Sequence, residues 1–368
     1  MKIVVILPTY NERENIKKVI YELKGVFQSL SKKYEISVLV VDDRSPDGTG
    51  EIVASLAKKD PKIYLLNGEK RGLGAAYVRG INYAIEKMSA DVVFEMDADL
   101  SHDPKLIPQF LKEIDDGSDF VIGSRYILGG SIPQNWGVSR KIYSTVANLF
   151  VRFGLMTPSI HDWTSGYRAI RTRVFKTIGT GLSRFPGYTF QVVVLHRTHQ
   201  AHFVISEIPL QFVDRSWGKS KIIPPEYIAS VVAYVLLHST FIRYLSVGVG
   251  GFVLQTLVSH ILVSLDVFPG VAVAFGAEAS IIFNFFTNNT WTFSHKKVSG
   301  KRNMAKKFLT FQISSFGAVV IQSAVVSLAT LELGEQVWFI AMVLSIIFLV
   351  IPYNFFIYNR FIWKTHER

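Results

Sequence analysis

Apolar and polar positions alternate in blocks over residues 1–222, and each block has the periodicity of one kind of element. Apolar runs at 3–7, 35–41 and 91–96 predict buried strands, whereas the segment 12–30 carries its apolar residues at helical spacing. Strands that are apolar along their whole length are typical of a parallel sheet covered by helices on both faces. The pattern therefore predicts a doubly wound, Rossmann-like α/β domain.

The pattern changes at about residue 244. Four apolar segments follow one another there, and each has the length of about 20 residues that a helix needs to cross a bilayer. Four such segments in succession are hard to bury in a soluble protein, so the sequence predicts an α-helical membrane domain of four transmembrane helices. The segments span residues 244–265, 270–293, 308–331 and 337–360.

The stretch PPEYIASVVAYVLLHSTFIRY, residues 224–244, lies between these two regions. It is apolar with polar breaks, which is typical of a helix that lies along a membrane surface. We therefore expect three parts in the chain. They are an α/β domain over residues 1–222, an interfacial linker over 223–243 and a membrane domain over 244–368.

The formal net charge of +11 is concentrated beside the predicted spans and at the predicted sheet edge. The connection at 294–307, between the second and third spans, carries six Lys or Arg residues. By the positive-inside rule this loop, the C-terminus and the α/β domain are expected in the cytoplasm. Basic residues beside the spans suit anionic lipid, and this distribution argues against nucleic acid as a partner. The absence of Cys excludes disulfides and thiolate catalysis.

Polar side chains follow three of the predicted strands. PTYNE at 8–12 follows the first, Asp42 and Asp43 end the second, and Asp97 and Asp99 follow the third. Ligands of such sheets bind beyond the carboxyl ends of the strands. Neighbouring carboxylates repel one another unless a cation lies between them, and Mg²⁺ or Mn²⁺ shares oxygen ligands with substrate phosphates. We expect such a metal, and the diphosphate of a ligand, at the third strand end.

A simpler alternative is that the Asp-x-Asp carboxylates cap the helix that begins at DPKLIPQF. Asp103 is already placed for capping, directly before Pro104 at the first helical position. His102 lies next to these acids, and we expect it to be a polar turn residue rather than a metal ligand.

Short motifs follow one another along residues 1–222. They are PTYNE, VVDDRSPDGT at 40–49, RGLGAA at 71–76, MDADLSHDP at 96–104, GSRY at 123–126, NWGVSRK at 135–141, SGYRA at 165–169, GYTFQ at 187–191 and EIPLQFVDRSWGKSKI at 207–222. Together these motifs resemble family 2 glycosyltransferases of the GT-A fold, and within that family they are most similar to dolichyl-phosphate mannose synthases and their polyprenyl-phosphate relatives. The four spans contain RYLSVGVGG at 243–251 and NFFTNNTWTF at 284–293, through which they resemble the GtrA-like membrane domain.

The resemblance implies a nucleotide-sugar site. The base and ribose would be lined by Pro8, Tyr10, Glu12, Val41 and Asp43, and the metal and diphosphate would be held by Asp97, Ala98 and Asp99. Ser101 stands where relatives often have Gln. Its shorter hydroxyl would be a weaker metal ligand, so a water would take part of that place. Arg215 and Lys221 would reach the donor phosphates.

The resemblance also implies an acceptor-phosphate site at Arg125, Arg140 and Ser144, and a catalytic set of Asp97, Asp99, Arg125 and Arg215. A lipid phosphate monoester is already an anion near neutral pH, so its attack needs little help from a general base. It does need positive charge to bring two phosphates together, which Arg and Lys supply. The alternative for each arginine is a solvated surface charge.

The implied activity is inverting transfer of mannose from GDP-mannose to dolichyl or polyprenyl phosphate at the cytoplasmic face of the membrane. An alternative donor within the class is UDP-glucose or another UDP-sugar. An alternative of another class is a non-catalytic protein that translocates or presents lipid-linked sugar. The bilayer is a further expected partner, and the sequence is compatible with a homo-oligomer.

Overall fold

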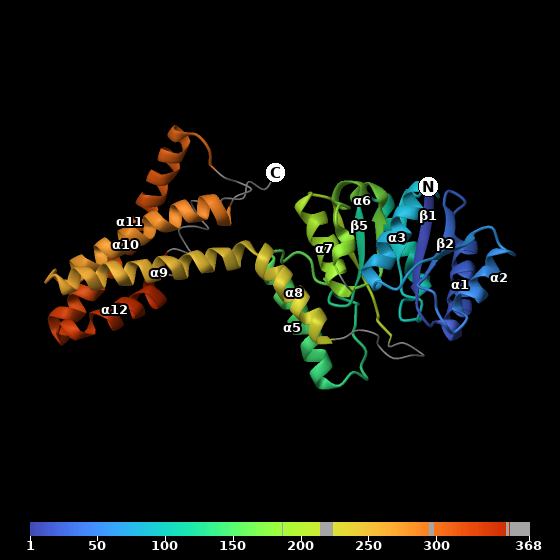
Figure 1. Cartoon of the computed structure of the whole chain (residues 1–368), viewed down its shortest axis with the longest axis horizontal. Coiled ribbons are helices and arrows are strands. Elements are labelled where there is room, and N and C mark those ends of the chain that lie inside the picture. The colour runs from blue at the N-terminus through green and yellow to red at the C-terminus, as the bar shows by residue number, and fades with distance from the viewer. Residues whose placement is uncertain (186, 214–223, 294–297, 351–352, 354–368) are drawn as a thin grey trace. The chain divides into compact units, whose positions relative to one another are not determined.

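The computed structural model describes residues 1–185, 187–213, 224–293, 298–350 and residue 353 (Figure 1). Contacts between residues divide the chain into two compact units, Met1–His238 and Ser239–Arg368. The first unit contains a β-sheet with helices, and the second is helical.

Seven strands of the described residues form one sheet in the order β3-β2-β1-β4-β6-β5-β7. In the first half of the sheet β1 pairs in parallel with β2 and β4, and β2 pairs in parallel with β3. This half is the parallel sheet that the apolar runs predict. The strands are β1 Lys2–Thr9, β2 Glu35–Asp42, β3 Ile63–Asn67, β4 Val92–Glu95, β5 Phe120–Ser124, β6 Arg168–Arg171 and β7 Ile205–Pro209.

The second half of the sheet departs from the purely parallel pattern, because β6 runs antiparallel to both β4 and β5. Four residues with an arginine at each end, Arg168–Arg171, carry too little periodicity to be recognised as a strand. The reversal places Arg168 opposite Glu95 in the register of the two strands. The loop that precedes β6 therefore enters the sheet at the edge where β4 ends.

Helices cover both faces of the sheet (Figure 1). Alternate residues of β1 point to opposite faces: Ile3, Val5 and Leu7 pack with α1, α2 and α4, and Val4 and Ile6 pack in the core that contains α3 and α5–α8. Fully burying one such aliphatic side chain contributes about 1.5–3 kcal/mol. The helices are α1 Arg13–Ser29, α2 Thr49–Ala57, α3 Leu73–Glu86, α4 Ile107–Asp115, α5 Val138–Gly154, α6 Thr172–Ile178, α7 Gly187–Gln200 and α8 Pro224–His238.

Helix α8 packs on the sheet unit along one side. Val235 is fully buried, and the hydroxyl of Tyr234 lies 2.9 Å from Nδ1 of His196 on α7. Burial lowers the pKa of His196 to about 4, so the imidazole is neutral at physiological pH. The other side of α8 exposes Leu236 and Leu237. The helix thus has one face in the core of the first unit and one apolar face outside it.

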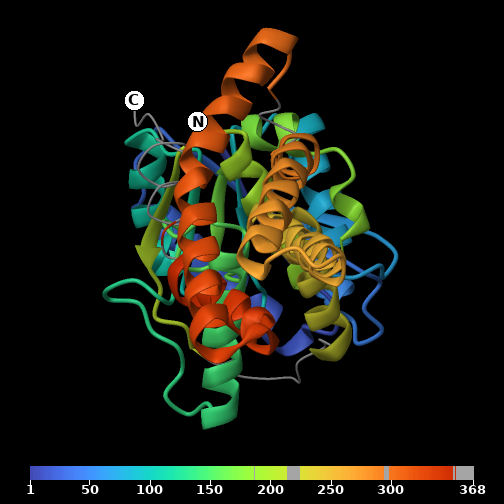
Figure 2. The ribbon, with the colours of Figure 1, turned by 90° about the vertical axis from the view of Figure 1, so that its left-hand side faces the viewer.

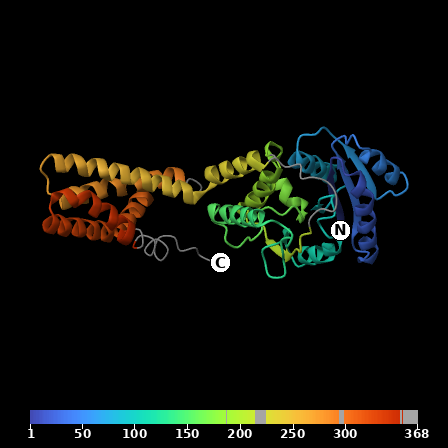
Figure 3. The ribbon, with the colours of Figure 1, turned by 90° about the horizontal axis from the view of Figure 1, so that it is seen from below.

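Among its described residues, the second unit contains three helices that are long and apolar enough to cross a membrane, Ile242–Ser264, Pro269–Thr292 and Lys301–Leu333. They correspond to α9 Thr240–Ser264, α10 Pro269–Thr287 with a π-helical turn after it, and α11 Lys301–Leu333. Helix α10 packs against both α9 and α11, and Figures 2 and 3 show these helices from two directions.

The fourth predicted span, 337–360, lies partly outside the described residues. Its first part is helical, as α12 Trp338–Ser345 followed by a π-helical turn to Val350. This described part belongs to a shorter apolar helix, Glu335–Val350. The second unit is therefore helical, as expected, and the number of four spans remains a prediction.

Candidate active site

The residues at the ends of β1 and β2 that are predicted to bind the nucleotide sugar lie side by side at the carboxyl edge of the sheet. Pro8 is the register partner of Val41, and the backbone N–H of Asp43 donates to the carbonyl of Thr9 at 3.1 Å. Helix α3 approaches this edge closely at Gly80, where a Cβ would come within 2.8 Å of Val41. A larger residue at that position would push the helix away from the strand ends.

The two acids that end β2 have separate surroundings. Asp42 is buried and accepts hydrogen bonds from Thr9 Oγ1 at 2.9 Å and from the Ser45 backbone and hydroxyl at 2.9 and 2.6 Å. It therefore fixes the turn after β2. Asp43 forms an ion pair with Arg79 of α3. Burial raises the pKa of Asp43, and the charge and hydrogen bond of Arg79 oppose that shift.

The PTYNE turn is fastened to the turn after β2. The backbone N–H of Asn11 donates to Ser45 Oγ at 3.0 Å, and that of Glu12 donates to Thr49 Oγ1 at 3.0 Å. Lys70 Nζ lies 3.7 Å from the ring centroid of Tyr10. Lys70, which no sequence motif pointed to, thus brings a positive charge to the predicted nucleotide site.

Asp97 and Asp99 follow β4, and each carboxylate is held by neighbours. Tyr77 of α3 donates its hydroxyl to Asp97 Oδ1 at 3.3 Å. The backbone and hydroxyl of Ser101 donate to Asp99 Oδ1 at 3.1 and 2.5 Å. Asp99 is 5% exposed, whereas the side chain of Asp97 is 32% exposed. Ser101 thus orients Asp99 in this structure.

His102 is a buried part of this turn and differs from an ordinary polar turn residue. Its Nδ1 accepts the backbone N–H of Asp97 at 3.0 Å, and its ring stacks on Tyr167 with centroids 4.9 Å apart. Burial lowers the pKa of His102, so the ring is neutral and its proton lies on Nε2. His102 therefore fixes the start of the Asp-x-Asp turn.

The oxygen atoms of Asp97 and Asp99 fit a hard divalent cation such as Mg²⁺ or Mn²⁺. Among the described residues, no group of three or more His, Cys, Asp or Glu side chains converges as a metal site. Two carboxylates are what a magnesium site needs when phosphate oxygens and water complete the shell. Asp103 caps the following 3₁₀ turn by accepting from the Lys105 N–H at 2.9 Å, so capping does not require Asp97 or Asp99.

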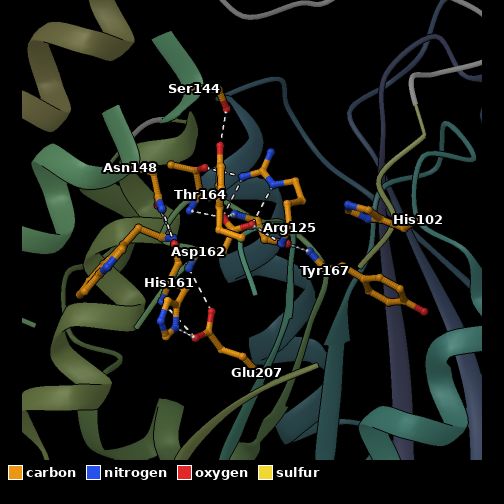
Figure 4. Close-up of polar contacts among 12 residues, drawn as sticks. His102, Arg125, Ser144, Asn148, His161, Asp162, Thr164, Tyr167 and Glu207 are labelled. Carbon is orange, nitrogen blue, oxygen red and sulfur yellow. Dashed lines mark hydrogen bonds and ion pairs between the residues drawn. The ribbon is translucent and has the colours of Figure 1, made fainter. Parts of the chain in front are cut away.

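Arg125 follows β5 and is bound by Asp162 (Figure 4). Its Nε and Nη2 each lie 2.8 Å from the Asp162 carboxylate, and Nη2 also donates to Thr164 Oγ1 at 2.6 Å. The side chain of Arg125 is 9% exposed and that of Asp162 is fully buried. Burial would raise the pKa of Asp162, but the charge and hydrogen bonds of Arg125 lower it below the usual value. Arg125 is therefore not a solvated surface charge.

The other two predicted acceptor residues lie on α5. Ser144 Oγ is 2.7 Å from the hydroxyl of Tyr126, the residue after Arg125 (Figure 4). Arg140 is exposed and its guanidinium lies 3.8 Å from the ring centroid of Trp136. Trp136 in turn contacts Phe212, whose ring lies 5.7 Å from the Arg125 guanidinium. Ser144 and Arg140 are thus linked to the Arg125 region. Arg215 and Lys221 lie outside the described residues.

Comparison with known proteins defines the family of the chain. Residues 4–179 match the family model described as glycosyl transferase family 2, and residues 243–363 match the GtrA/DPMS transmembrane domain. A dolichol-phosphate mannosyltransferase of Pyrococcus furiosus is 33% identical over 328 residues, which are 87% of this chain and 88% of the relative. The chain belongs to the family 2 glycosyltransferases.

Other relatives of this glycosyltransferase cover a smaller share of it. A polyprenol monophosphomannose synthase of Mycolicibacterium smegmatis is 39% identical over 59% of this chain and 79% of the relative. An undecaprenyl-phosphate mannosyltransferase of Micrococcus luteus is 39% identical over 60% of this chain and 87% of the relative. Among solved structures, a glucosyl-3-phosphoglycerate synthase from Mycobacterium tuberculosis covers 64% of this chain and 77% of its own, with 19% identity and a TM-score of 0.47.

The glycosyltransferase also buries an acid, Glu95, at the end of β4 directly before its Asp-x-Asp turn, and this residue was not among the candidates expected from the sequence. Glu95 and its register partner Arg168 are both fully buried. Arg168 is held by the carbonyl oxygens of Gln191 and Trp163 at 2.9 and 3.2 Å. Burial raises the pKa of Glu95 to about 7, and the charge of Arg168 opposes that shift. A buried acid with this pKa makes the folded state sensitive to pH.

Replacing Glu95 with Gln is expected to flatten the dependence of stability on pH. The pKa of Glu95 rises from an ordinary 4.5 to about 7 on folding, so between these values the folded state holds a proton that the unfolded chain has lost. The contribution of Glu95 to the free energy of unfolding is therefore fully present below pH 4.5 and is lost as the pH rises towards 7, by about 3 kcal/mol in total. Tryptophan-monitored thermal unfolding of wild type and Glu95→Gln from pH 5 to 8 measures the difference. If the two proteins lost stability in parallel over this pH range, the assigned role of Glu95 would be wrong.

Proposed function

We propose that this enzyme transfers mannose from GDP-mannose to dolichyl or another polyprenyl phosphate, with inversion, at the cytoplasmic face of the membrane. The observation that carries the proposal is the relative named dolichol-phosphate mannosyltransferase. Its match of 328 residues is longer than the first unit of 238 residues, so it extends into both units. The two relatives that share 39% identity are also named for mannose and a polyprenyl carrier, which supports the same acceptor class.

The donor would lie over the carboxyl ends of β1, β2 and β4. Pro8, Val41 and Asp43 are neighbours there and would contact the nucleoside, together with Tyr10 and Glu12. Asp97 and Asp99 would hold a divalent cation, which when bound would stabilise charge on the departing nucleotide diphosphate. Arg215 and Lys221 would add positive charge to the same phosphates.

The acceptor phosphate would be bound by Arg125, Arg140 and Ser144. One of its oxygens would form the new bond to the anomeric carbon on the side opposite the diphosphate, while the bond from that carbon to the diphosphate oxygen breaks. The acceptor oxygen carries no proton at neutral pH, and the diphosphate leaves as an anion, so no proton transfer is required. Arg side chains suit this task because the guanidinium presents paired donors to phosphate oxygens.

Helix α5 offers a surface for the acceptor's apolar chain. One face exposes Val138, Ile142, Val146, Leu149 and Phe153, at the spacing of a helical stripe. Asn148 on another face is buried and bonds to the loop at His161–Trp163. We propose that the exposed stripe contacts the bilayer, so that Arg140 and Ser144 on the same helix lie near lipid phosphates.

A double substitution of Ile142→Glu and Val146→Glu is expected to raise the KM for a long-chain polyprenyl phosphate about tenfold or more. Each aliphatic side chain removed from lipid costs about 1.5 kcal/mol, and about 1.4 kcal/mol is tenfold. A short, water-soluble prenyl phosphate should be used as before, and Tyr21→Glu, an exposed residue of α1, serves as the control. Equal effects on both acceptors would contradict a membrane role for α5.

The donor is tested by offering GDP-mannose and UDP-glucose in parallel to the purified enzyme with polyprenyl phosphate and Mn²⁺ or Mg²⁺. The proposal predicts product from GDP-mannose. Product from UDP-glucose alone would retain the mechanism and replace the donor. The non-catalytic alternative, a protein that only translocates or presents lipid-linked sugar, would gain support from a chain that binds lipid-linked sugar and transfers none.

A further inference from the structure

The loop that joins α5 to β6 contacts residues of the proposed acceptor site and also the turn that carries the proposed metal ligands (Figure 4). Asp162 in this loop binds Arg125, and the two residues beside it bind Asn148 of α5: His161 through its carbonyl and Trp163 through its N–H at 2.9 Å. The same loop continues to Tyr167, which stacks on His102 behind Asp97.

We propose that Asp162 is a positioning residue that sets the orientation of Arg125 for the acceptor phosphate. This inference rests on the proposed function, because it assigns a task to a residue of the acceptor site. Asp162 itself is fully buried and would not touch the substrate. It acts through the guanidinium group that it holds.

The contacts of Asp162 fix Arg125 at three points. Its carboxylate accepts the backbone N–H of Arg125 at 3.0 Å, Nε at 2.8 Å and Nη2 at 2.8 Å. Thr164 accepts a further hydrogen bond from Nη2 at 2.6 Å. Bonds to both Nε and Nη2 define the plane of the guanidinium group, whereas a single contact would leave the side chain free to rotate. An arginine held in this way needs little reordering when it binds a phosphate.

Asp162 is itself held by a second acid. Glu207 of β7 accepts the backbone N–H of Asp162 at 3.0 Å and that of His161 at 3.0 Å, and its carboxylate lies 2.7 Å from His161 Nδ1. These bonds attach the loop to an edge strand of the sheet. Through Asn148 the loop also holds α5, which carries Arg140 and Ser144. Arg125 and the other acceptor residues are therefore fixed to one loop.

A matched pair of substitutions separates positioning from stability. Asp162→Asn keeps the size of the side chain and weakens the ion pair with Arg125. Asp119→Asn likewise weakens the ion pair of another buried acid, which lies at the opposite end of β5. Asp119 pairs with Arg173 at 2.5 Å and accepts the Val204 N–H at 3.1 Å. Thr164→Val removes one hydrogen bond from Arg125 and leaves the Asp162 ion pair intact.

Initial rates of the full-length enzyme are measured with the acceptor varied at saturating donor, and with the donor varied at saturating acceptor. Asp162→Asn should raise the KM for polyprenyl phosphate about tenfold or more and change the KM for the donor less than about twofold. Thr164→Val should raise the acceptor KM by a smaller factor, and Asp119→Asn should leave it unchanged. An unchanged acceptor KM in both Asp162→Asn and Thr164→Val, or the same increase in Asp119→Asn, would overturn the inference.

Direct binding of farnesyl phosphate to the full chain distinguishes this inference from the proposed function. A wild-type chain that transfers no mannose, yet binds farnesyl phosphate more tightly than Asp162→Asn and Thr164→Val, would refute the function and support the positioning role. A wild-type chain that binds no farnesyl phosphate, or binds it as Asp162→Asn does, would refute the positioning role.

Discussion

Asp99→Ala is expected to lower kcat by about 10³-fold or more while the protein stays folded. The substitution removes one of the two carboxylates proposed to hold the metal, and with it the stabilisation of charge on the leaving diphosphate. Loss of one such preorganised electrostatic contact costs about 10²–10³ in kcat, and a metal ligand affects the whole ion. Initial rates at saturating donor and acceptor measure the effect.

Asp103→Asn is the matched control, because Asp103 lies in the same turn and caps the following 3₁₀ helix. The control should retain activity and lose at most about 1 kcal/mol of stability. The carboxylate of Asp99 also accepts two hydrogen bonds from Ser101, so thermal unfolding of each variant shows whether the turn survives. An Asp99→Ala enzyme with more than a tenth of wild-type kcat would refute the metal and diphosphate role.

Arg125→Ala is expected to lower both stability and activity, each by a large amount. It leaves the fully buried carboxylate of Asp162 without its charge partner, which costs about 3–5 kcal/mol of stability. It also removes a guanidinium from the proposed acceptor site, for which we expect about a 10²-fold loss of kcat/KM for the lipid phosphate. Thermal unfolding and acceptor-dependent rates measure the two effects separately.

The double variant Arg125→Met with Asp162→Asn separates the two losses. It removes both charges of the buried pair, so much of the stability should return. Activity should remain low, because the acceptor phosphate still lacks its arginine. A double variant that regains wild-type activity would show that Arg125 serves only to neutralise Asp162.

The parts of the fold that follow from periodicity could be predicted from sequence. The runs that became β1, β2 and β4 are mostly apolar, and the three long apolar helices found among the described residues match three predicted segments closely. Strand β6 could not be predicted in this way, because Arg168–Arg171 is short and its direction depends on pairing with β4 and β5. Local pattern carries no information on such pairing.

The candidate site could likewise be predicted from the sequence only in part. Acids and arginines at strand ends, such as Asp97 and Arg125, are visible in the sequence because they interrupt apolar runs. Their partners are not visible, since Asp162 is 37 residues from Arg125 and Glu207 is 45 residues from Asp162. His102 resembled a turn residue because its burial depends on Tyr167, which lies 65 residues later in the chain, directly before the antiparallel strand β6.

The most direct test of the account is the identity and anomeric configuration of the lipid product formed by the purified full-length enzyme. GDP-mannose, polyprenyl phosphate and Mn²⁺ or Mg²⁺ are supplied, and the product is examined by mass spectrometry and NMR. Direct attack by the lipid phosphate predicts a polyprenyl phosphate that carries one mannose, with the configuration at the anomeric carbon inverted from that of the donor. A product with retained configuration, or mannose found only as free sugar, would contradict direct attack by the lipid phosphate.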